Sequence, residues 1–290
     1  MNIRVDKLSK HYRQKKVLNE VSFQIDEPKI YGLLGRNGAG KTTFMEILAG
    51  HQLPTSGEVY VNSEIPFDNR SILEHICLIK EGNNFNRELK VKHVLKTYSL
   101  FYPNWDEALA NTLVQEYKLP IQAKVKALSK GMESALGVIV GLASNAFITI
   151  FDEPYIGLDA AARKKFYDML LEQYEERPRT IIFSTHLIDE VSLLFEEVLI
   201  LQNGELILQE KAEMLRENAY SVTGTKEEVE AFIQNKHVMK TKQLANMMTA
   251  YIFGSQVGVE QTDLNVEGVP IQDLMIYLTE EGVEKEWMPN

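Results

Sequence analysis

Residues 35–43, with the sequence GRNGAGKTT, match the spacing G-x-x-x-x-G-K-[ST] of a phosphate-binding loop (P-loop). An apolar strand is expected at 29–34 before the loop, and a helix from Phe44 to Ala49 after it. Glycines let successive backbone N–H groups turn toward phosphate oxygens, and the helix directs the positive end of its dipole there. Lys41 would reach the β- and γ-phosphates, and the Thr42 hydroxyl would bind magnesium. We expect these residues to hold the nucleotide phosphates: Gly35, Asn37, Gly38, Ala39, Gly40, Lys41, Thr42 and Thr43.

Two adjacent carboxylates, Asp152 and Glu153, follow a second apolar strand expected at 147–151. In phosphate-loop folds this is the place of a carboxylate that binds magnesium directly or through water. Neighbouring side chains at a strand end point in different directions, so Asp152 can face the metal while Glu153 faces the attacking water as a base. A solvated strand end is the alternative, and the phosphate loop favours the catalytic interpretation.

The run at 134–151 contains 18 residues without a charge. As one helix it would reach about 27 Å, the lower limit for crossing a hydrocarbon core. Ser144 and Asn145 interrupt it, and a β-branched and aromatic segment follows. We therefore expect a buried helix, a turn and a buried parallel strand that delivers the two carboxylates.

The composition is that of a globular protein. The chain has 290 residues, 44% hydrophobic and 25% charged, enough for one large or two ordinary domains. The first ten residues hold no apolar segment of the signal-peptide kind, so we expect a cytoplasmic chain. The single cysteine, Cys77, can form neither an internal disulfide nor a zinc cluster, and we expect it to be a small buried hydrophobic residue.

The charge is unevenly distributed. The formal net charge is −10, and residues 205–290 carry 15 acidic against 7 basic side chains, hence −8 of that total. This argues against nonspecific DNA binding and against an anionic lipid surface as partner. The one basic cluster, at 11–16, is too small for a nucleic-acid patch, and we expect it to form a solvated turn.

The remaining pattern predicts the elements that position these residues. Strands at 2–8 and 17–25 would form an antiparallel layer, and helices at 91–101 and 105–117 a helical region. Further strands are expected at 180–184, 198–201 and 205–208, the last two joined by a tight turn at Asn203-Gly204. The rear of the chain predicts, in order, a strand (219–224), a helix (225–234), three strands (238–242, 246–253 and 261–266) and a helix (271–280).

A further motif, Leu128-Ser129-Lys130-Gly131-Met132, places Ser129 23 positions before Asp152. With the motifs above, this order resembles the ATP-binding subunit of an ABC transporter, whose Leu-Ser-Gly-Gly-Gln signature closes over the ATP held by an opposing subunit. The resemblance covers about residues 1–215. It implies an α/β fold: a P-loop NTPase core with a parallel sheet, an antiparallel β layer and a helical subdomain at about 82–145. Residues 216–290 would form a small C-terminal α+β accessory domain.

The resemblance assigns further site residues. Tyr12 matches the aromatic residue that stacks on adenine, and His186 matches the switch histidine near the γ-phosphate. Gly157-Leu158-Asp159 resembles the loop that crosses the dimer interface. Ser129 and the backbone N–H of Gly131, at the start of a helix, form an anion-binding end aimed at the other subunit's γ-phosphate. Hydrolysis of ATP with Mg²⁺ would then need two such domains, head to tail, with Glu153 and His186 as catalytic residues.

The chain departs from the family pattern at two places. Glu81 occupies the position of a glutamine that contacts magnesium, and as a carboxylate it could still bind the metal. Lys130 and Met132 replace a glycine and the glutamine of the signature. Ser-Lys-Gly-Met variants resemble those of bacterial exporters of peptide antibiotics and amphipathic peptides, including the phenol-soluble modulin type, and the segment 101–106 adds to that resemblance. We therefore hypothesise export of a peptide-like or amphipathic substrate.

The expected partners are a separate transmembrane permease subunit and a second ATP-binding subunit, either an identical chain or a paralogue, with no nucleic acid. The chain would lie at the cytoplasmic face of the membrane. The main alternative is a soluble ABC-type ATPase that acts on ribosomes or DNA, which usually carries coiled-coil insertions, basic arms or two fused copies. A P-loop kinase or GTPase leaves the 128–132 motif and His186 unexplained. For the rear segment a dimer-supporting or regulatory role is favoured over a neutral extension.

Overall fold

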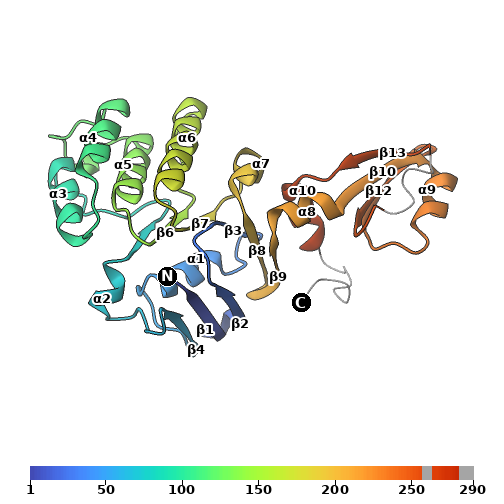
Figure 1. Cartoon of the computed structure of the whole chain (residues 1–290), viewed down its shortest axis with the longest axis horizontal. Coiled ribbons are helices and arrows are strands. Elements are labelled where there is room, and N and C mark those ends of the chain that lie inside the picture. The colour runs from blue at the N-terminus through green and yellow to red at the C-terminus, as the bar shows by residue number, and fades with distance from the viewer. Residues whose placement is uncertain (257–262, 281–290) are drawn as a thin grey trace.

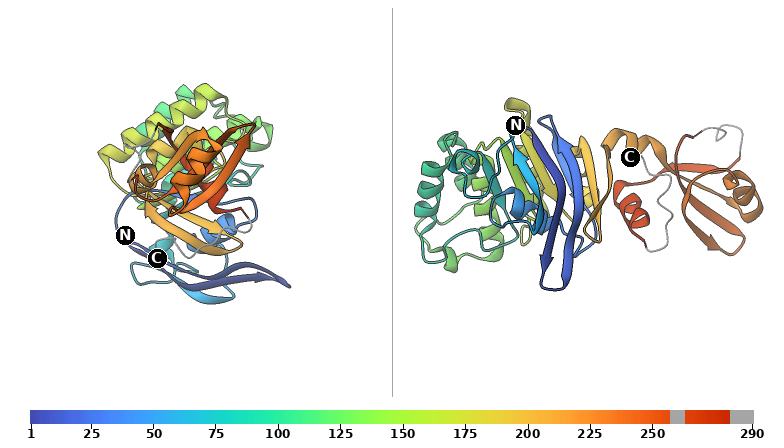
Figure 2. Two further views of the ribbon diagram at one scale, coloured as in Figure 1. Left: turned by 90° about the vertical axis from the view of Figure 1, so that its right-hand side faces the viewer. Right: turned by 90° about the horizontal axis from the view of Figure 1, so that it is seen from below.

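The computed structural model describes residues 1–256 and 263–280 (Figure 1). Its strands form three sheets of six, three and four strands. A group of helices lies at one end of the molecule, the six- and three-stranded sheets lie in the middle, and the four-stranded sheet lies at the other end (Figures 1 and 2). The predicted fold class, an α/β ATPase core with a smaller α+β unit, is confirmed.

The six-stranded sheet carries the candidate site at the ends of its strands. All neighbouring pairs are parallel except the last, which is antiparallel and joined at Asn203-Gly204, where both residues have positive φ of 51° and 83°. Every residue of β3 (Ile30–Leu34), β6 (Ile148–Asp152) and β7 (Thr180–Ser184) is buried, as expected for parallel strands covered on both faces. In spatial order the strands are β5 (Ile76–Ile79), β6 (Ile148–Asp152), β7 (Thr180–Ser184), β3 (Ile30–Leu34), β8 (Glu197–Gln202) and β9 (Glu205–Lys211).

The three-stranded antiparallel sheet has the order β2 (Lys15–Ile25), β1 (Ile3–Tyr12) and β4 (Ser56–Val61). It packs over α1 (Lys41–Leu48), and both contribute to one hydrophobic cluster with the central sheet. The expected antiparallel layer is confirmed, and its two strands are joined by a solvated turn within 11–16 as predicted, although the turn is shorter than expected. Only Arg13 and Gln14 form the turn, and the other four residues of 11–16 occupy exposed strand positions.

The helical region consists of α3 (Val91–Phe101), α4 (Glu107–Glu116) and α5 (Lys130–Ala143). From Ser134 onward every residue of α5 is buried, and the chain then turns into β6, so the uncharged run is a helix, a turn and a strand as predicted. A Cβ at Gly141 would lie 2.4 Å from the Phe151 ring, so glycine lets the helix pack directly on the strand that follows it. Among the described residues, no helix has the length and apolar character needed to cross a membrane.

The rear of the chain forms the four-stranded sheet, with Tyr220, Val222 and Ile252 in its own hydrophobic cluster. The predicted order of strand, helix, three strands and helix is confirmed, except that 261–262, the start of the third expected strand, lie outside the described residues. In spatial order the strands are β11 (Val238–Leu244), β12 (Met247–Phe253), β10 (Ala219–Thr225) and β13 (Asn265–Gly268), and the helices of this part are α9 (Lys226–Ile233) and α10 (Ile271–Leu278).

The C-terminal helix α10 packs on the ATPase core, and four further α-helices of the described residues connect the remaining elements. Helix α10 packs against α7 and joins the hydrophobic cluster of the ATPase core. Cys77 on β5 is fully buried and carries no disulfide, as expected. The remaining α-helices are α2 (Arg70–Leu73), α6 (Ala160–Glu176), α7 (Ile188–Val191) and α8 (Ala212–Asn218).

Candidate active site

The predicted phosphate loop joins the end of β3 to the start of α1. Gly35, Gly38 and Gly40 have φ values of 147°, 84° and 105°, which L side chains rarely adopt. A Cβ at Gly35 would also lie 2.3 Å from the Leu201 carbonyl oxygen, so the loop needs glycine for both conformation and space. The loop therefore has the backbone that a phosphate cradle requires.

Lys41, the first residue of α1, is folded back over this loop. Its Nζ donates to the Gly35 carbonyl oxygen at 2.6 Å and to the Arg36 carbonyl oxygen at 3.4 Å. Burial lowers the pKa of Lys41, and the nearby carboxylates of Glu153 and Asp152 act in the opposite direction. A phosphate placed in the loop would give this ammonium a charged acceptor in place of neutral carbonyls.

Thr42 and Asp152 meet beside the loop, because α1 begins next to the end of β6. The Thr42 hydroxyl donates to Asp152 Oδ2 at 2.6 Å. Asp152 is 7% exposed, and burial raises the pKa of its carboxyl group. These two oxygen donors fit a magnesium ion, which prefers one or two protein oxygens together with water and substrate phosphates. The described residues contain no cluster of three or more His, Cys, Asp or Glu side chains able to hold a metal.

Glu153 has different partners from its neighbour. Its φ of 52° is in the left-handed region, and its backbone N–H donates to the Ser184 carbonyl oxygen at 3.0 Å. Its Oε2 lies 2.8 Å from His186 Nδ1 and accepts a hydrogen bond from the Tyr155 hydroxyl. The two carboxylates are therefore separated as predicted, but by a backbone turn rather than by strand alternation.

The signature motif opens α5. Ser129 caps this helix, its hydroxyl accepting from the Met132 backbone N–H at 3.2 Å. A Cβ at Gly131 would lie 2.4 Å from the Gly157 carbonyl oxygen, so the loop at 157–159 packs directly on the start of the helix. In the same loop Asp159 caps α6 by accepting from the Ala162 backbone N–H at 2.8 Å. Gly131 thus lies against the loop that contains Asp159.

A cavity of about 580 Å³ lies between the phosphate loop and the signature. Thr42 and Asp152 line it together with Glu81, Leu128 and Lys130. Glu81 therefore faces the same cavity as the two expected magnesium ligands. Its carboxylate is engaged by Lys130.

Tyr12 stands at the end of β1 and is 42% exposed, and the Lys10 ammonium lies over its ring at 5.2 Å from the centroid. Its hydroxyl bonds to Gln52 Oε1, and Gln52 Nε2 donates to Glu46 on α1. Glu46 also pairs with Lys80 at 2.9 Å. A polar chain thus runs from the expected adenine site to the loop after β5.

Sequence reasoning missed several residues of this site. Glu46 and Lys80 gave no signal, because their pairing joins a helix to a distant loop. Tyr155 and Thr185 lie beside the recognised Glu153 and His186, but their contact with each other depends on the left-handed turn at Glu153.

The comparisons with known proteins agree with this geometry. The family profile described as "ABC transporter" matches residues 18–156. An uncharacterized ABC transporter ATP-binding protein, MJ1023 of Methanocaldococcus jannaschii, is 36% identical over 205 residues, which cover 68% of this chain and 72% of that protein. The chain belongs to the ABC transporter family. It is an ATP-binding ATPase of that family.

Two further matches place this ABC ATPase among its relatives. Nod factor export ATP-binding protein I of Rhizobium etli is 30% identical over 197 residues, which cover 66% of this chain and 62% of that protein. The dimeric structure of a post-hydrolysis state of the ATP-binding cassette MJ0796, bound to ADP and Pi, covers 72% of this chain and 98% of that one. At 23% identity and a TM-score of 0.64, this second likeness establishes the shared fold.

Proposed function

We propose that this chain is the ATP-hydrolysing subunit of an ABC exporter that moves a peptide-like or amphipathic substrate through a separate membrane subunit. The observation that carries this proposal is the arrangement of two cavities that share Lys80 and Asn83. One cavity adjoins the nucleotide-phosphate residues, and the other is an apolar pocket suited to a partner segment. Residues 1–215 would form the ATPase domain and residues 216–290 the accessory domain.

The nucleotide would bind with its base on Tyr12 and its phosphates in the loop at 35–43. Lys41 would leave the loop carbonyls for the β- and γ-phosphates, where its charge is matched. Thr42 and Asp152 would hold Mg²⁺, with Glu81 contributing from the facing loop. The ion, when bound, neutralises charge on the phosphate oxygens.

Hydrolysis would use the carboxylate of Glu153 as the base that orients the attacking water. His186 would turn from Glu153 to donate a hydrogen bond to the γ-phosphate. A second ATP-binding subunit, identical or paralogous, would supply Ser129, Gly131 and Asp159 from the opposite side. The dimeric structure of the related MJ0796 cassette supports this arrangement.

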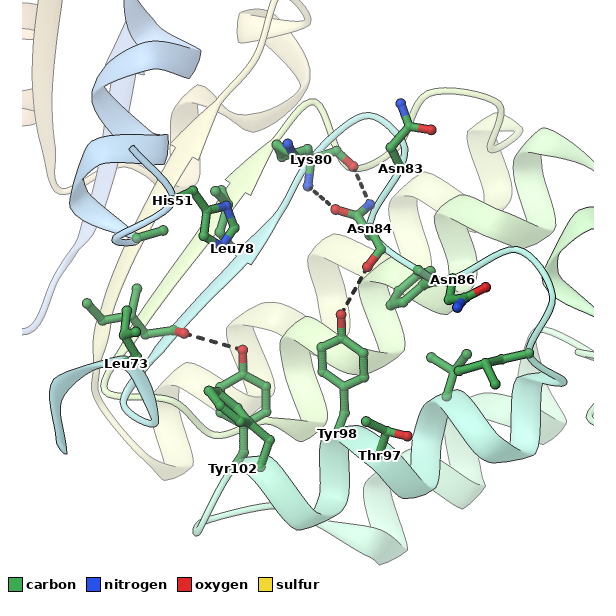
Figure 3. Close-up of a pocket in the computed structure, with 16 residues that line it drawn as sticks. His51, Leu73, Leu78, Lys80, Asn83, Asn84, Asn86, Thr97, Tyr98 and Tyr102 are labelled. Carbon is green, nitrogen blue, oxygen red and sulfur yellow. Dashed lines mark hydrogen bonds between the residues drawn. The ribbon is translucent and has the colours of Figure 1, made fainter. Parts of the chain in front are cut away.

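The second cavity, of about 600 Å³, lies between the loop after β5 and α3 (Figure 3). Its walls are largely apolar, formed by Leu73, Leu78, Phe85, Tyr98 and Phe101. The cavity is built rigidly. Asn84 bonds in both directions with the Lys80 backbone at 2.8 and 2.7 Å, and the Tyr98 hydroxyl donates to the Asn84 carbonyl oxygen at 3.0 Å (Figure 3).

A short amphipathic helix on the cytoplasmic side of the membrane subunit would fit this pocket with its apolar face inward. The exposure of Phe101 on the pocket wall supports this docking, since this large apolar side chain is 46% exposed, and the preceding residue of α3, Leu100, is 75% exposed. Lys80 would couple the nucleotide site to the docked helix, because it lines both cavities and pairs with Glu46 on the helix that follows the phosphate loop.

The signature and one relative support the proposed substrate class. The Ser-Lys-Gly-Met variant resembles peptide exporters, and the Nod factor relative is named for export. No residue of this chain contacts the substrate in this scheme, since the membrane subunit binds it. The accessory domain would support the dimer or regulate the ATPase.

The test is an affinity purification of the Glu153→Gln chain from membranes in the presence of ATP and magnesium, with mass spectrometry of the proteins that accompany it. We expect a multi-span membrane protein in stoichiometric amount. The second ATPase chain in that complex would distinguish a homodimer from a pair of paralogues. Recovery of ribosomal or DNA-bound proteins, with no membrane protein, would overturn the proposal in favour of a soluble ATPase.

A further inference from the structure

Tyr155 lies two residues after Glu153 and is only 2% exposed. Its hydroxyl contacts two groups, the Glu153 carboxylate at Oε2 and the Thr185 hydroxyl. Thr185 is equally buried, at 2% exposed, and directly precedes His186. A buried hydrogen-bond chain therefore joins the loop after β6 to the loop after β7.

The direction of these hydrogen bonds follows from the groups at the two ends of the hydrogen-bond chain. An ionised carboxylate can only accept, so the Tyr155 hydroxyl donates its one proton to Glu153. Burial raises the pKa of Tyr155, so this proton stays in place. The Tyr155 oxygen must then accept from Thr185, whose own oxygen accepts from the Leu187 backbone N–H at 2.8 Å. Thr185 and Tyr155 therefore each donate and accept, and the donors run in order from the Leu187 N–H to the Glu153 carboxylate.

The ring of Tyr155 is fixed by packing. It stacks on Phe183 of β7 with ring centroids 6.4 Å apart and an interplanar angle of 13°. The His186 and Tyr155 rings pack edge to face, with ring centroids 5.9 Å apart and an interplanar angle of 60°. Because Phe183 belongs to the buried strand β7, its packing against the Tyr155 ring holds the hydroxyl beside Glu153.

We propose that Tyr155 is a positioning residue that holds Oε2 of Glu153 so that the other carboxylate oxygen, Oε1, faces the attacking water. This inference rests on the proposed role of Glu153 as the base. His186 and Tyr155 bind the same oxygen. When His186 turns to the γ-phosphate, Tyr155 remains as the donor and keeps the carboxylate oriented.

The test is the Tyr155→Phe substitution in the full chain, which removes one hydroxyl and keeps the buried ring. We expect kcat for ATP to fall about tenfold, the size of effect that follows from losing one buried hydrogen bond at the transition state, with KM for ATP and the Kd for a nonhydrolysable analogue unchanged. Thr185→Val should lower kcat in the same sense, and Thr185→Ser, which keeps the hydroxyl, should restore it.

Tyr167 offers a matched control. It is 8% exposed, its ring lies 6.3 Å from Phe183, and its hydroxyl has no hydrogen-bond partner among the described residues. Tyr167→Phe thus removes a hydroxyl from the same aromatic cluster without touching Glu153, and kcat should stay within twofold of wild type.

The outcomes separate this inference from the proposed function. If Glu153→Gln abolishes hydrolysis and Tyr155→Phe keeps the wild-type kcat, the positioning role is wrong and the base assignment stands. A Tyr155→Phe variant that loses nucleotide affinity and thermal stability together with kcat would also overturn it, because that pattern indicates a merely structural residue. Wild-type hydrolysis by Glu153→Gln would refute the base assignment itself, and with it the inference.

Discussion

Lys130 and Glu81 form an ion pair, with Nζ 2.9 Å from Oε1, that joins the first turn of α5 to the loop after β5. Both residues stand where the chain departs from the family pattern, Lys130 in the signature and Glu81 in place of the usual glutamine. One contact therefore accounts for two departures, since the extra negative charge beside the expected triphosphate is balanced by an extra positive charge on the signature. The side chains are 59% and 55% exposed, so the pair is screened by solvent.

Glu81→Gln should increase the magnesium concentration needed for half-maximal ATP hydrolysis by about threefold, because one carboxylate facing the cavity of Thr42 and Asp152 is lost. Lys130→Ala is the matched variant. This substitution frees Glu81 from its ion pair, so that it can bind the metal. The magnesium concentration needed for half-maximal hydrolysis should therefore fall or stay constant. Magnesium titrations of the ATPase rate measure both, and an unchanged requirement in Glu81→Gln would exclude Glu81 as a metal ligand. Either substitution should change the free energy of unfolding by less than about 1 kcal/mol.

Lys41→Ala should weaken ATP binding by about 10- to 100-fold, which corresponds to losing a charge-assisted hydrogen bond to phosphate of about 1.5–3 kcal/mol. Without nucleotide the same variant should be as stable as wild type or more so, because burial of the ammonium already lowers the pKa of Lys41 in the folded chain. Calorimetric titration with ATP and thermal unfolding without it test the two parts. Equal ATP affinity in Lys41→Ala would contradict the phosphate-loop assignment.

Asp152→Asn should raise the Tm of the nucleotide-free chain at neutral pH. Burial raises the pKa of Asp152 above the usual value of 3.8, so the folded state holds this proton more tightly than the unfolded state. The ionised carboxyl group therefore costs stability above its folded pKa, and this cost disappears as the pH falls below 3.8.

The difference in Tm between Asp152→Asn and wild type should consequently shrink as the pH is lowered from 8 to 4. Thermal unfolding across this range measures it, with the exposed Asp168→Asn as a control for general charge effects. A difference that grows toward acid pH would show that the carboxylate stabilises the empty site. The variant should also lose the stabilisation that magnesium and ATP together give wild type.

The parts of the site that follow a linear pattern could be predicted from the sequence. The glycine spacing of the phosphate loop, the β6 strand before Asp152 and the uncharged run at 134–151 are local, and their elements form as expected. The partners of Glu153 could not be predicted in this way. They depend on a left-handed backbone at a non-glycine residue, which brings Tyr155 and the loop after β7 to one oxygen.

The basic cluster at 11–16 does contain the expected turn, but the turn is confined to Arg13 and Gln14. Charge alone favoured a turn, but alternation with buried residues such as Leu8 and Leu18 extends β1 and β2 almost to the hairpin tip. Exposed strand positions accept lysine and arginine at little cost, so a run of basic residues does not by itself indicate a loop.

Phe101→Asp tests the docking pocket on a side chain that is already 46% exposed, so the change should leave the fold intact. A charge placed on this apolar wall should reduce recovery of the proposed membrane subunit at least about tenfold, since docking would bury that charge without a partner. ATP hydrolysis by the isolated chain should stay within twofold of wild type, because Phe101 lines the pocket at α3 and does not line the cavity of Thr42 and Asp152.

Leu244→Asp, at an 83% exposed position on the hairpin between β11 and β12, is the matched control and should leave recovery unchanged. If both variants lose the membrane subunit equally, the partner is not held by this pocket; if Leu244→Asp alone loses it, the docking surface lies on the C-terminal sheet.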